Sequence, residues 1–380
     1  MEQLHAEVGF SQLCKTGEEL CGDTVEVVRT PSDTIVVLSD GLGSGVKANI
    51  LATLTTKIAA SMLQKGIPLE DVVDTITATL PVCKQRKVAY STFHILKISR
   101  DGTTSIVEFD CPATFLKRGN HVVSFPTKEK VISGKVIRVG ELALQKDDLL
   151  IAVSDGVIHA GIGALLKLGW GWQGVASQLT ADCSAAMDAN TVSNQIISCC
   201  QGYYLDKAGD DSTVVSVKIR TPIQLTLFTG PPADKTYDEK VVQRFLRQPG
   251  SKIIAGGTTA NIVSRVTNRK LSVNMTYHHP DVPPTGKIDG IDLVTEGVLT
   301  LNIAVERLRC ATPLHSLDGA TSLARMLSEA DEIKIIAGSA INPAHQNPNF
   351  PMQINLKNHI LHQLIDVLQA KGKQVAIEWV

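Results

Sequence analysis

The feature that most constrains the fold is a change in the order of strands and helices near residue 220. Before this point, strand-like segments come in neighbouring pairs joined by short turns: 25–30 with 34–40, 91–99 with 104–110, and 113–119 with 121–126. Such pairs predict antiparallel hairpins. The helices expected to cover the resulting sheets lie at 46–64, 69–79 and 172–201. The first half is therefore predicted to be α+β, with helices packed on sheets.

After residue 220 the chain alternates strictly between strand and helix patterns. The expected strands are 225–230, 252–256, 271–277, 291–297, 332–338 and 374–380, and the expected helices are 236–247, one from Thr259, 299–309, 318–329 and 354–371. This alternation predicts an α/β domain with a mostly parallel sheet. We place the boundary at 219–223, which divides the chain into domains 1–220 and 221–380, a reasonable division for 380 residues.

Composition excludes several classes of protein. The net charge is −1 and only 20% of residues are charged, which argues against a strongly basic nucleic-acid binder and against a highly charged disordered chain. No apolar run reaches the roughly 18 residues that span a bilayer, and the N-terminus is too polar for a signal peptide. We expect no membrane partner and a cytoplasmic location. None of the eight cysteines forms a C-x-x-C pair, and Cys199 and Cys200 are expected in the core.

The first half carries aspartates at strand ends or tight turns, each beside a glycine or another aspartate. They are Asp23, Asp40, Asp155 and the pair Asp210 and Asp211. Carboxylates and backbone carbonyls held on rigid strands are the oxygen ligands that Mg²⁺ and Mn²⁺ prefer. Any one of these sites alone is better explained as turn chemistry. The ordered series, with its repeated Ser-Asp-Gly unit, favours a site for two ions that could activate a water for phosphoester hydrolysis.

The ordered motifs resemble a known family. They are Gly22-Asp23, Asp40-Gly41 with Gly45, Tyr90-Ser91-Thr92, 112–119, 147–150, Ser154-Asp155-Gly156 and 210–215. Together they resemble the metal-dependent protein phosphatases of the protein phosphatase 2C type, in the bacterial branch of sporulation stage II protein E. The resemblance covers residues 1 to about 219.

This resemblance implies a β-sandwich flanked by helices, with two Mn²⁺ or Mg²⁺ ions at one end. Asp40 would bridge the ions, Asp155 and Asp210 would bind the first, and the carbonyl of Gly41 would bind the second. These three aspartates are the expected catalytic residues. Asp23 would act at the second ion directly or through water. Asp211 is expected to be a turn residue or to support the ligands from outside the set.

The chain also departs from the family pattern. We find neither the phosphate-gripping arginine nor the proton-donating histidine of the eukaryotic members in an unambiguous position. Lys15 could contact phosphate, although a lone lysine is more often solvated. His159 could move protons or could merely pack, and His94, within a strand, is expected to be structural. The helices 46–64 and 69–79 follow Asp40-Gly41 directly; in the resembling branch this element is a regulatory switch, but an apolar helix beside a site is more often core.

The second half offers weaker signals. Small residues follow three expected strands and could line a pocket for a small ligand or an anion; they are Gly256, Gly257, Thr258, Thr259, Thr295, Glu296, Gly297, Gly338 and Ser339. Ligands bind outside the carboxyl ends of strands in open parallel sheets, where helix N-termini also point. Tight turns with a capping threonine explain the same residues. His278, His279 and Asp281 could bind a metal, but a polar loop explains them better.

The sequence leaves three functions open. The first is a Mn²⁺/Mg²⁺-dependent phosphoserine/phosphothreonine protein phosphatase in bacterial signalling, with a phosphoprotein substrate such as an anti-sigma-factor antagonist-like regulator and a C-terminal domain that senses a ligand or recruits a partner. The second is an inactive signalling scaffold, against which the complete set of carboxylates argues. The third is a small-molecule phosphohydrolase that uses the same site.

Overall fold

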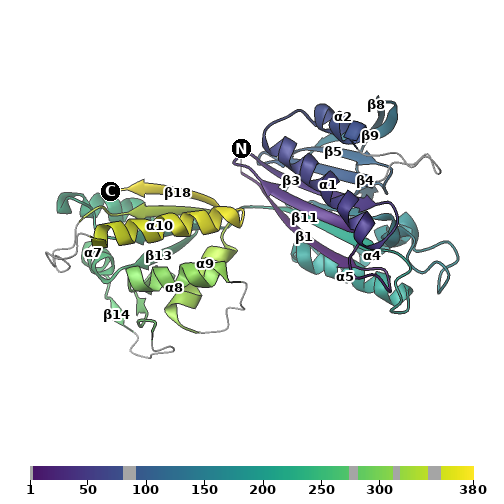
Figure 1. The fold of residues 1–380 in the computed structure, drawn as a ribbon. Helices are drawn as coiled ribbons and strands as arrows, with labels where there is room; N and C mark the ends of the chain where they lie inside the picture. The colour runs from purple at the N-terminus through teal and green to yellow at the C-terminus, as the bar shows by residue number, and fades with distance from the viewer. Residues whose placement is uncertain (1–2, 80–90, 274–280, 311–316, 341–351) are drawn as a thin grey trace. The chain divides into compact units, whose positions relative to one another are not determined.

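The computed structural model describes residues 3–79, 91–273, 281–310, 317–340 and 352–380, with side chains from residue 356 onward in the last range. Contacts between residues divide the chain into two compact units, Met1–Thr221 and Pro222–Val380. Figure 1 shows the helices and strands of both units. None of the helices in the described ranges has the length and apolar character needed to cross a bilayer.

Unit 1 contains two antiparallel sheets. The first has the strand order β2 (Asp23–Arg29), β3 (Asp33–Gly41), β4 (Ser91–Ser99), β5 (Thr103–Phe109), β9 (Lys135–Ala143) and β8 (Lys128–Ile132). The second has the order β1 (His5–Leu13), β11 (Ser212–Arg220), β10 (Leu149–Val153), β6 (Phe115–Arg118) and β7 (His121–Ser124). The predicted hairpins are confirmed, because β2 pairs with β3, β4 with β5 and β6 with β7.

The two sheets form a sandwich with helices on its outer faces. Between them lies an apolar layer that includes Val36 and Leu96 from the first sheet and Leu150 and Val217 from the second. Helices α1 (Gly45–Gln64) and α2 (Leu69–Thr79) cover the first sheet. Helices α3 (Asp155–Ile158), α4 (Gly171–Asp182) and α5 (Ala189–Tyr203) cover the second. The predicted β-sandwich flanked by helices is confirmed.

The helix expected at 172–201 is in fact two helices, α4 and α5. Asp188 begins the second one by accepting a hydrogen bond from the backbone N–H of Thr191 at 2.8 Å. A capping aspartate of this kind satisfies a backbone donor that a helix N-terminus leaves free. The spacing of the apolar residues alone does not reveal this break.

Unit 2 is built on one seven-stranded sheet. Its order is β14 (Ser272–Val273), β15 (Gly286–Lys287), β16 (Leu293–Thr295), β13 (Ser251–Ala255), β12 (Gln224–Thr229), β17 (Glu332–Ala337) and β18 (Gln374–Trp379). The five strands from β16 to β18 in this order are parallel, and only β14 and β15 run antiparallel. The prediction of a mostly parallel sheet is confirmed.

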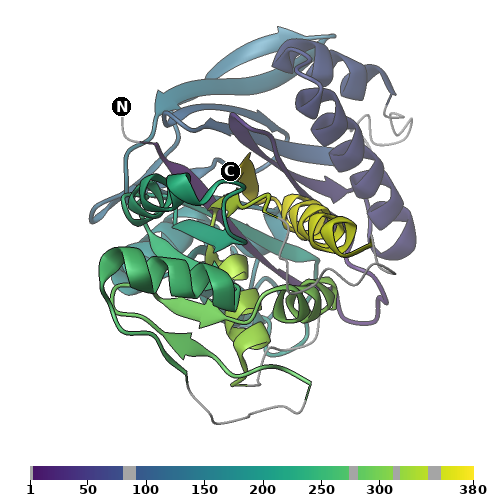
Figure 2. The ribbon, with the colours of Figure 1, turned by 90° about the vertical axis from the view of Figure 1, so that its left-hand side faces the viewer.

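Helices cover both faces of this sheet (Figure 2). One face packs against α6 (Asp238–Leu246), which follows a short helical turn at Lys235–Tyr237, and against α7 (Gly257–Thr267). The other packs against α8 (Val298–Arg309), α9 (Gly319–Glu329) and α10 (Met352–Ala370). After β12 the chain adds β13, β14, β15 and β16 on one side of β12, and it then returns to place β17 on the other side. The order of connections therefore reverses between β12 and β17.

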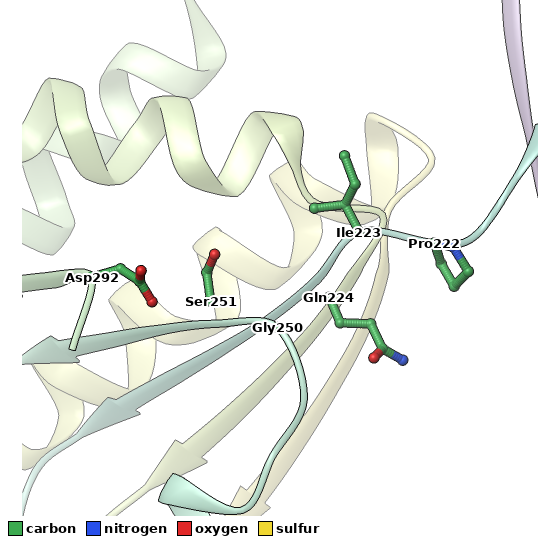
Figure 3. A pocket seen from close by; sticks show the side chains of 6 residues that line it. All are labelled: Pro222, Ile223, Gln224, Gly250, Ser251 and Asp292. Carbon is green, nitrogen blue, oxygen red and sulfur yellow. The ribbon is translucent and has the colours of Figure 1, made fainter. Parts of the chain in front are cut away.

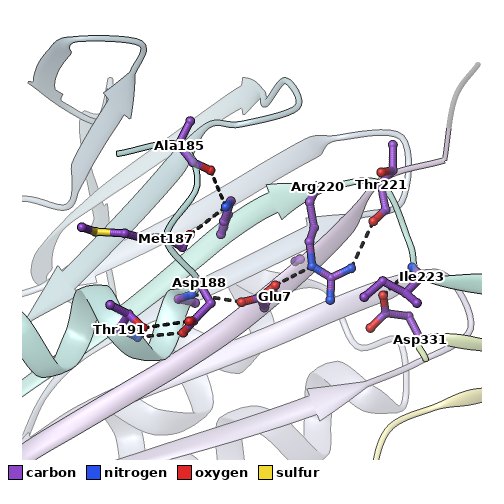
Figure 4. Close-up of polar contacts among 12 residues, drawn as sticks. Glu7, Ala185, Met187, Asp188, Thr191, Arg220, Thr221, Ile223 and Asp331 are labelled. Atoms are coloured by element: carbon purple, nitrogen blue, oxygen red, sulfur yellow. Dashed lines mark hydrogen bonds and ion pairs between the residues drawn. The ribbon is translucent and has the colours of Figure 1, made fainter. Parts of the chain in front are cut away.

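The chain is secured within its own unit on each side of residues 221 and 222. In unit 1, Arg220 at the end of β11 is paired with Glu7 on β1, and Glu7 also accepts a hydrogen bond from the N–H of Ala189 at 3.0 Å (Figure 4). In unit 2, Asp331 accepts a hydrogen bond from the N–H of Ile223 at 2.7 Å. Each of these contacts joins residues of the same unit.

Candidate metal centre

Two of the predicted ligands face each other on neighbouring strands. In the antiparallel register of β2 and β3, Asp23 is paired with Asp40. Asp23 begins β2, and Asp40 is the last residue but one of β3. The buried apolar residues of β3, from Ile35 to Leu38, fix this strand between the central core and α1. The two carboxylates therefore lie at one end of the first sheet, on strands that the core holds in place.

The second sheet supplies two more carboxylates at the same end of the sandwich. Asp155 follows the last residues of β10, and Asp210 lies just before β11. These strand ends are joined because the hydroxyl of Ser154 accepts a hydrogen bond from the N–H of Thr213 at 2.8 Å. The N–H of Ser154 in turn donates to the carbonyl of Thr213 at 3.0 Å. Asp155 and Asp210 are thus held next to each other by the same backbone pairing.

The four carboxylates influence one another electrostatically. Burial raises the pKa of Asp40 from its usual 3.8 to about 9, with further contributions from the charges of Asp23, Asp155 and Asp210. Burial also raises the pKa of Asp210, and the nearby charge of Asp155 adds to it. Charges shift one another's pKa in this way when they lie near one another. The structure therefore brings together Asp23, Asp40, Asp155 and Asp210.

The surroundings of Asp23 show most clearly that the four carboxylates suit a bound cation. Its side chain is buried, with 2% relative exposure, and neither carboxylate oxygen has a hydrogen-bond partner. Burial raises its pKa from 3.8 to about 6, although the nearby hydroxyls of Thr213 and Ser154 act in the opposite direction. An unpaired buried carboxylate is costly unless a cation or a proton neutralises it. The donor set is all oxygen, which suits Mg²⁺ or Mn²⁺.

Both glycines that follow the Ser-Asp pairs are required by close packing. A Cβ atom on Gly41 would overlap the backbone carbonyl of Ala48 in α1, and a Cβ atom on Gly156 would overlap the carbonyl of Asp211. Each glycine thus lets a neighbouring backbone approach the strand end that carries a candidate ligand. The repeated Ser-Asp-Gly unit is explained by packing as well as by turn geometry.

The other predicted residues in this region have different surroundings. Asp211 is buried and accepts a hydrogen bond from the N–H of Lys15 at 2.9 Å, so it supports the loop after β1. The charge of Lys15 acts to lower the pKa of Asp210, so the Lys15 side chain lies near the carboxylates. His159 lies with Nδ1 3.9 Å from Asp155, and both side chains are about half exposed.

His94 has the structural role that its strand position predicted. It is buried, and its Nε2 lies 2.9 Å from the carbonyl oxygen of Pro112. Burial lowers its pKa, so the ring is held neutral. It fixes the loop before β6 and takes no part in the carboxylate group.

A pair of serines supports Asp40, a role that the sequence motifs did not indicate. The hydroxyls of Ser39 and Ser91 share a hydrogen bond, and the hydroxyl of Ser91 donates to the carbonyl of Asp40 at 3.0 Å. Ser91 begins β4, which lies beside β3. The repetition of serine before both Asp40 and Asp155 was the available signal, since both serines tie their strand end to a neighbouring strand.

In unit 2 the structure groups only some of the residues of the suggested pocket. The N–H of Gly256 donates to the carbonyl of Thr295 at 2.9 Å, and Gly297 packs against Gly256. The hydroxyls of Thr259 and Thr295 are buried without a hydrogen-bond partner. Thr258 and Glu296 are exposed nearby at the carboxyl ends of β13 and β16.

Gly338 and Ser339 lie apart from this group, at the end of β17, with β12 between β17 and β13. The carbonyl of Gly338 accepts from Lys357, and Ser339 donates to the carbonyl of Val380. Asp281 is exposed, while His278 and His279 lie outside the described residues. The suggested second metal group is therefore not tested.

A shallow open pocket lies at the opposite end of the same sheet (Figure 3). It is lined by Pro222, Ile223, Gln224, Gly250, Ser251 and Asp292, at the amino ends of β12, β13 and β16. Asp292 already accepts a hydrogen bond from the N–H of Lys252 at 2.7 Å. This pocket does not contain any of the residues that the sequence analysis singled out.

Comparisons with known proteins agree with the architecture. Residues 30–220, half of the chain, match the family described as stage II sporulation protein E. The stage II sporulation proteins E of Priestia megaterium and Bacillus subtilis (strain 168) are 24% and 25% identical to this chain, each over 40% of its length. The matched parts make up only 27% and 19% of those two proteins.

A solved structure shows the same fold. It contains the PP2C phosphatase domain and a fragment of the regulatory domain of the cell fate determinant SpoIIE from Bacillus subtilis. It matches 58% of this chain and 63% of its own chain at a TM-score of 0.50 and 22% sequence identity. The protein phosphatase 2C-like sandwich implied by the motifs is confirmed.

Proposed function

Because the chain belongs to the stage II sporulation protein E family, we propose that it is a metal-dependent phosphoserine/phosphothreonine protein phosphatase of bacterial signalling. The observation that carries the proposal is the convergence of four carboxylates at one end of the sandwich, where Asp23 is buried without a partner and Asp40 has a strongly raised pKa. Perturbed titratable groups gathered on rigid elements are a common mark of functional sites.

Two Mn²⁺ or Mg²⁺ ions would be held by Asp23, Asp40, Asp155, Asp210 and the carbonyl of Gly41. Asp40 is the proposed bridging ligand, because it interacts with each of the other three carboxylates. When bound, such ions lower the pKa of a water and neutralise the phosphoryl group. No serine or cysteine nucleophile is then needed.

The chain's own side chains complete the site. Lys15 lies close enough to influence Asp210, and its positive charge can attract the phosphate group of a substrate. His159 is half exposed at 3.9 Å from Asp155, so it can exchange protons with both solvent and a leaving oxygen. Asp211 holds the backbone of Lys15 and thereby positions it.

The proposed substrate is a small phosphoprotein, such as an anti-sigma-factor antagonist-like regulator. His159 and Asp155 are about half exposed, so the candidate site opens to solvent and is not sealed inside the core. A phosphorylated side chain on the surface of another protein can reach a site of this kind. A small-molecule phosphoester is the competing substrate class.

Unit 2 is proposed to bind a small polar ligand at the carboxyl ends of β13 and β16. The unpartnered hydroxyls of Thr259 and Thr295 and the open space around Gly257 support this proposal. Glu296 favours a ligand that also carries a hydroxyl or amine. Calorimetric screening of nucleotides and phosphorylated metabolites against the full chain tests it, with Gly257→Val expected to abolish binding. Equal binding by Gly257→Val would show that the ligand does not bind at this place.

Hydrolysis of p-nitrophenyl phosphate and of phosphoserine peptides by the full chain tests the phosphatase proposal. Turnover is expected with Mn²⁺, with the phosphopeptide preferred when compared by kcat/KM. A preference for phosphorylated metabolites would indicate the small-molecule enzyme. Absence of turnover on every substrate with either metal would indicate a scaffold.

A further inference from the structure

Two cysteines stand at the two ends of the loop between β1 and β2. Cys14 directly follows β1 and is exposed, whereas Cys21 is buried and lies two residues before Asp23. The sulfur atoms of Cys14 and Cys21 and one carboxylate oxygen of Asp211 all lie within 4.8 Å of one another. These three residues, which we call the thiol cluster, come from the loop after β1 and from the residue before β11.

Asp211 supplies an independent reason to expect a ligand in the thiol cluster. Its side chain is 4% exposed, and its Oδ1 accepts the hydrogen bond from Lys15 while its Oδ2 has no partner. A Cβ atom on Gly22 would lie 2.8 Å from Oδ2, so the loop packs closely against this oxygen. A buried oxygen of this kind is costly unless a cation or a donor satisfies it.

We propose that Cys14, Cys21 and Asp211 bind one thiophilic divalent cation of the zinc class, at a site separate from the carboxylate centre. Zinc is held by thiolate at about 2.3 Å and by carboxylate at about 2.0–2.2 Å, with a tetrahedral arrangement that three protein ligands and one water can complete. Sulfur ligands select zinc over Mg²⁺ and Mn²⁺, which prefer oxygen. The two sites would therefore take up different cations from the same solution.

The thiol cluster is connected to the carboxylate centre through Gln12. Its Nε2, which carries two hydrogens, lies within hydrogen-bond distance of three acceptors: the sulfur of Cys21 at 3.6 Å, the carbonyl of Asp23 at 3.2 Å and the hydroxyl of Thr213 at 3.1 Å. A cation in the cluster would tie both ends of the β1–β2 loop to the start of β11. It would thereby hold Asp23 and Asp210 in place, which is a positioning role. Binding of the cation to the thiol cluster does not depend on the proposed phosphatase activity.

Titration of the full, reduced chain with Co²⁺ tests this site, because cobalt bound to thiolate gives a near-ultraviolet charge-transfer band that cobalt bound to oxygen does not. One equivalent is expected to produce the band, and Zn²⁺ is expected to remove it. Cys14→Ser and Cys21→Ser should each lose about half of its intensity or more, and the double variant should lose all of it. Loss of even an outer-shell partner typically weakens metal binding by about 10–100-fold, so Asp211→Asn, which replaces a proposed ligand, should weaken Co²⁺ binding by about tenfold or more while keeping the band.

Matched variants separate this site from other cysteines and from the carboxylate centre. Cys310→Ser, an exposed cysteine in unit 2, should leave the band unchanged. Asp40→Asn should also leave it unchanged, so that a failed phosphatase proposal does not affect the result. The proposal is overturned if the wild-type chain gives no band with stoichiometric Co²⁺, or if the band survives in the Cys14→Ser/Cys21→Ser variant.

Discussion

Asp23 lies directly opposite Asp40 in the antiparallel pair formed by β2 and β3. Two carboxylates at opposed positions of a β pair destabilise the sheet when both are ionised, and burial raises the pKa of both carboxyls, so that a proton or a cation is favoured there. The metal-free unit therefore keeps an unfavourable arrangement that bound cations would relieve.

Asp40→Asn should stabilise the protein when metal is removed with a chelator. The pKa of Asp40 in the folded state, about 9, lies above its usual 3.8. Between these two values the unfolded chain ionises this carboxyl more readily than the folded chain does, so the free energy of unfolding falls as the pH rises. The gain from Asp40→Asn should be near zero at pH 4 and reach roughly 2–5 °C in Tm at pH 8. Thermal melts across this pH range measure it.

Asp147→Asn serves as the control, because Asp147 is exposed and has a positive φ of 71°, a conformation that asparagine also tolerates. It should leave Tm unchanged at every pH. A lower Tm for Asp40→Asn at pH 8 would show that the carboxyl stabilises the metal-free fold, contrary to this interpretation.

Gly156→Ala should displace Asp155. The added methyl group would meet the carbonyl of Asp211 and the hydroxyl of Ser212, so the start of α3 must move away from β11. A shift of about 1 Å in a ligand can reduce activity by about 100-fold, and the overlap should also cost about 1–3 kcal/mol of stability. Gly202→Ala, in α5 with open space around it, should retain activity and fold at least as stably. Comparable Tm and turnover for both alanine variants would refute the packing argument.

Residues 1–221 should fold without unit 2. The pairing of Glu7 with Arg220 and the hydrogen bond from Ala189 to Glu7 lie entirely in unit 1. The fragment should melt cooperatively and retain metal-dependent turnover of p-nitrophenyl phosphate, which circular dichroism and a colorimetric assay can measure. An insoluble fragment, or one that ignores added Mn²⁺, would mean that unit 2 completes the phosphatase unit.

The hypothesis that α1 regulates the site can be tested with Leu54→Glu. Leu54 is 45% exposed, whereas Leu63 is 5% exposed and belongs to the core, so Leu63→Glu should unfold the unit. The backbone of α1 packs against Gly41 through Ala48, and a change in its position would move Asp40. Leu54→Glu should remain folded and shift the Mn²⁺ dependence of activity. An unchanged Mn²⁺ dependence would leave α1 as a packing element only.

Local patterns predicted much of this architecture. Neighbouring strand-like segments joined by short turns predicted the hairpins β2–β3 and β4–β5, because a short turn leaves the chain few other ways to pair. The stretch 172–201 was predicted as one helix, since its apolar spacing does not reveal the turn that Asp188 closes. Capping depends on a backbone geometry that the spacing of apolar residues does not encode.

The candidate site was predictable only in part, for a similar reason. Asp40 and Asp155 stood out because each follows an apolar strand and precedes glycine. The Ser39–Ser91 hydrogen bond and the thiol cluster join residues far apart in the sequence. Such contacts depend on how whole strands pair, so no local sequence motif predicts them.

The most direct test of the central claim is the rate at which the full chain releases phosphate from a phosphoserine peptide with Mn²⁺, for wild type, Asp40→Asn and Asp23→Asn. Chelation should abolish the wild-type rate and added Mn²⁺ should restore it. Asp40→Asn should lower kcat/KM by about 100-fold or more, and by more than Asp23→Asn, since the proposed bridging ligand touches both ions. Asp147→Asn should match wild type. Undiminished turnover by Asp40→Asn, or turnover that persists in chelator, would contradict the two-ion centre.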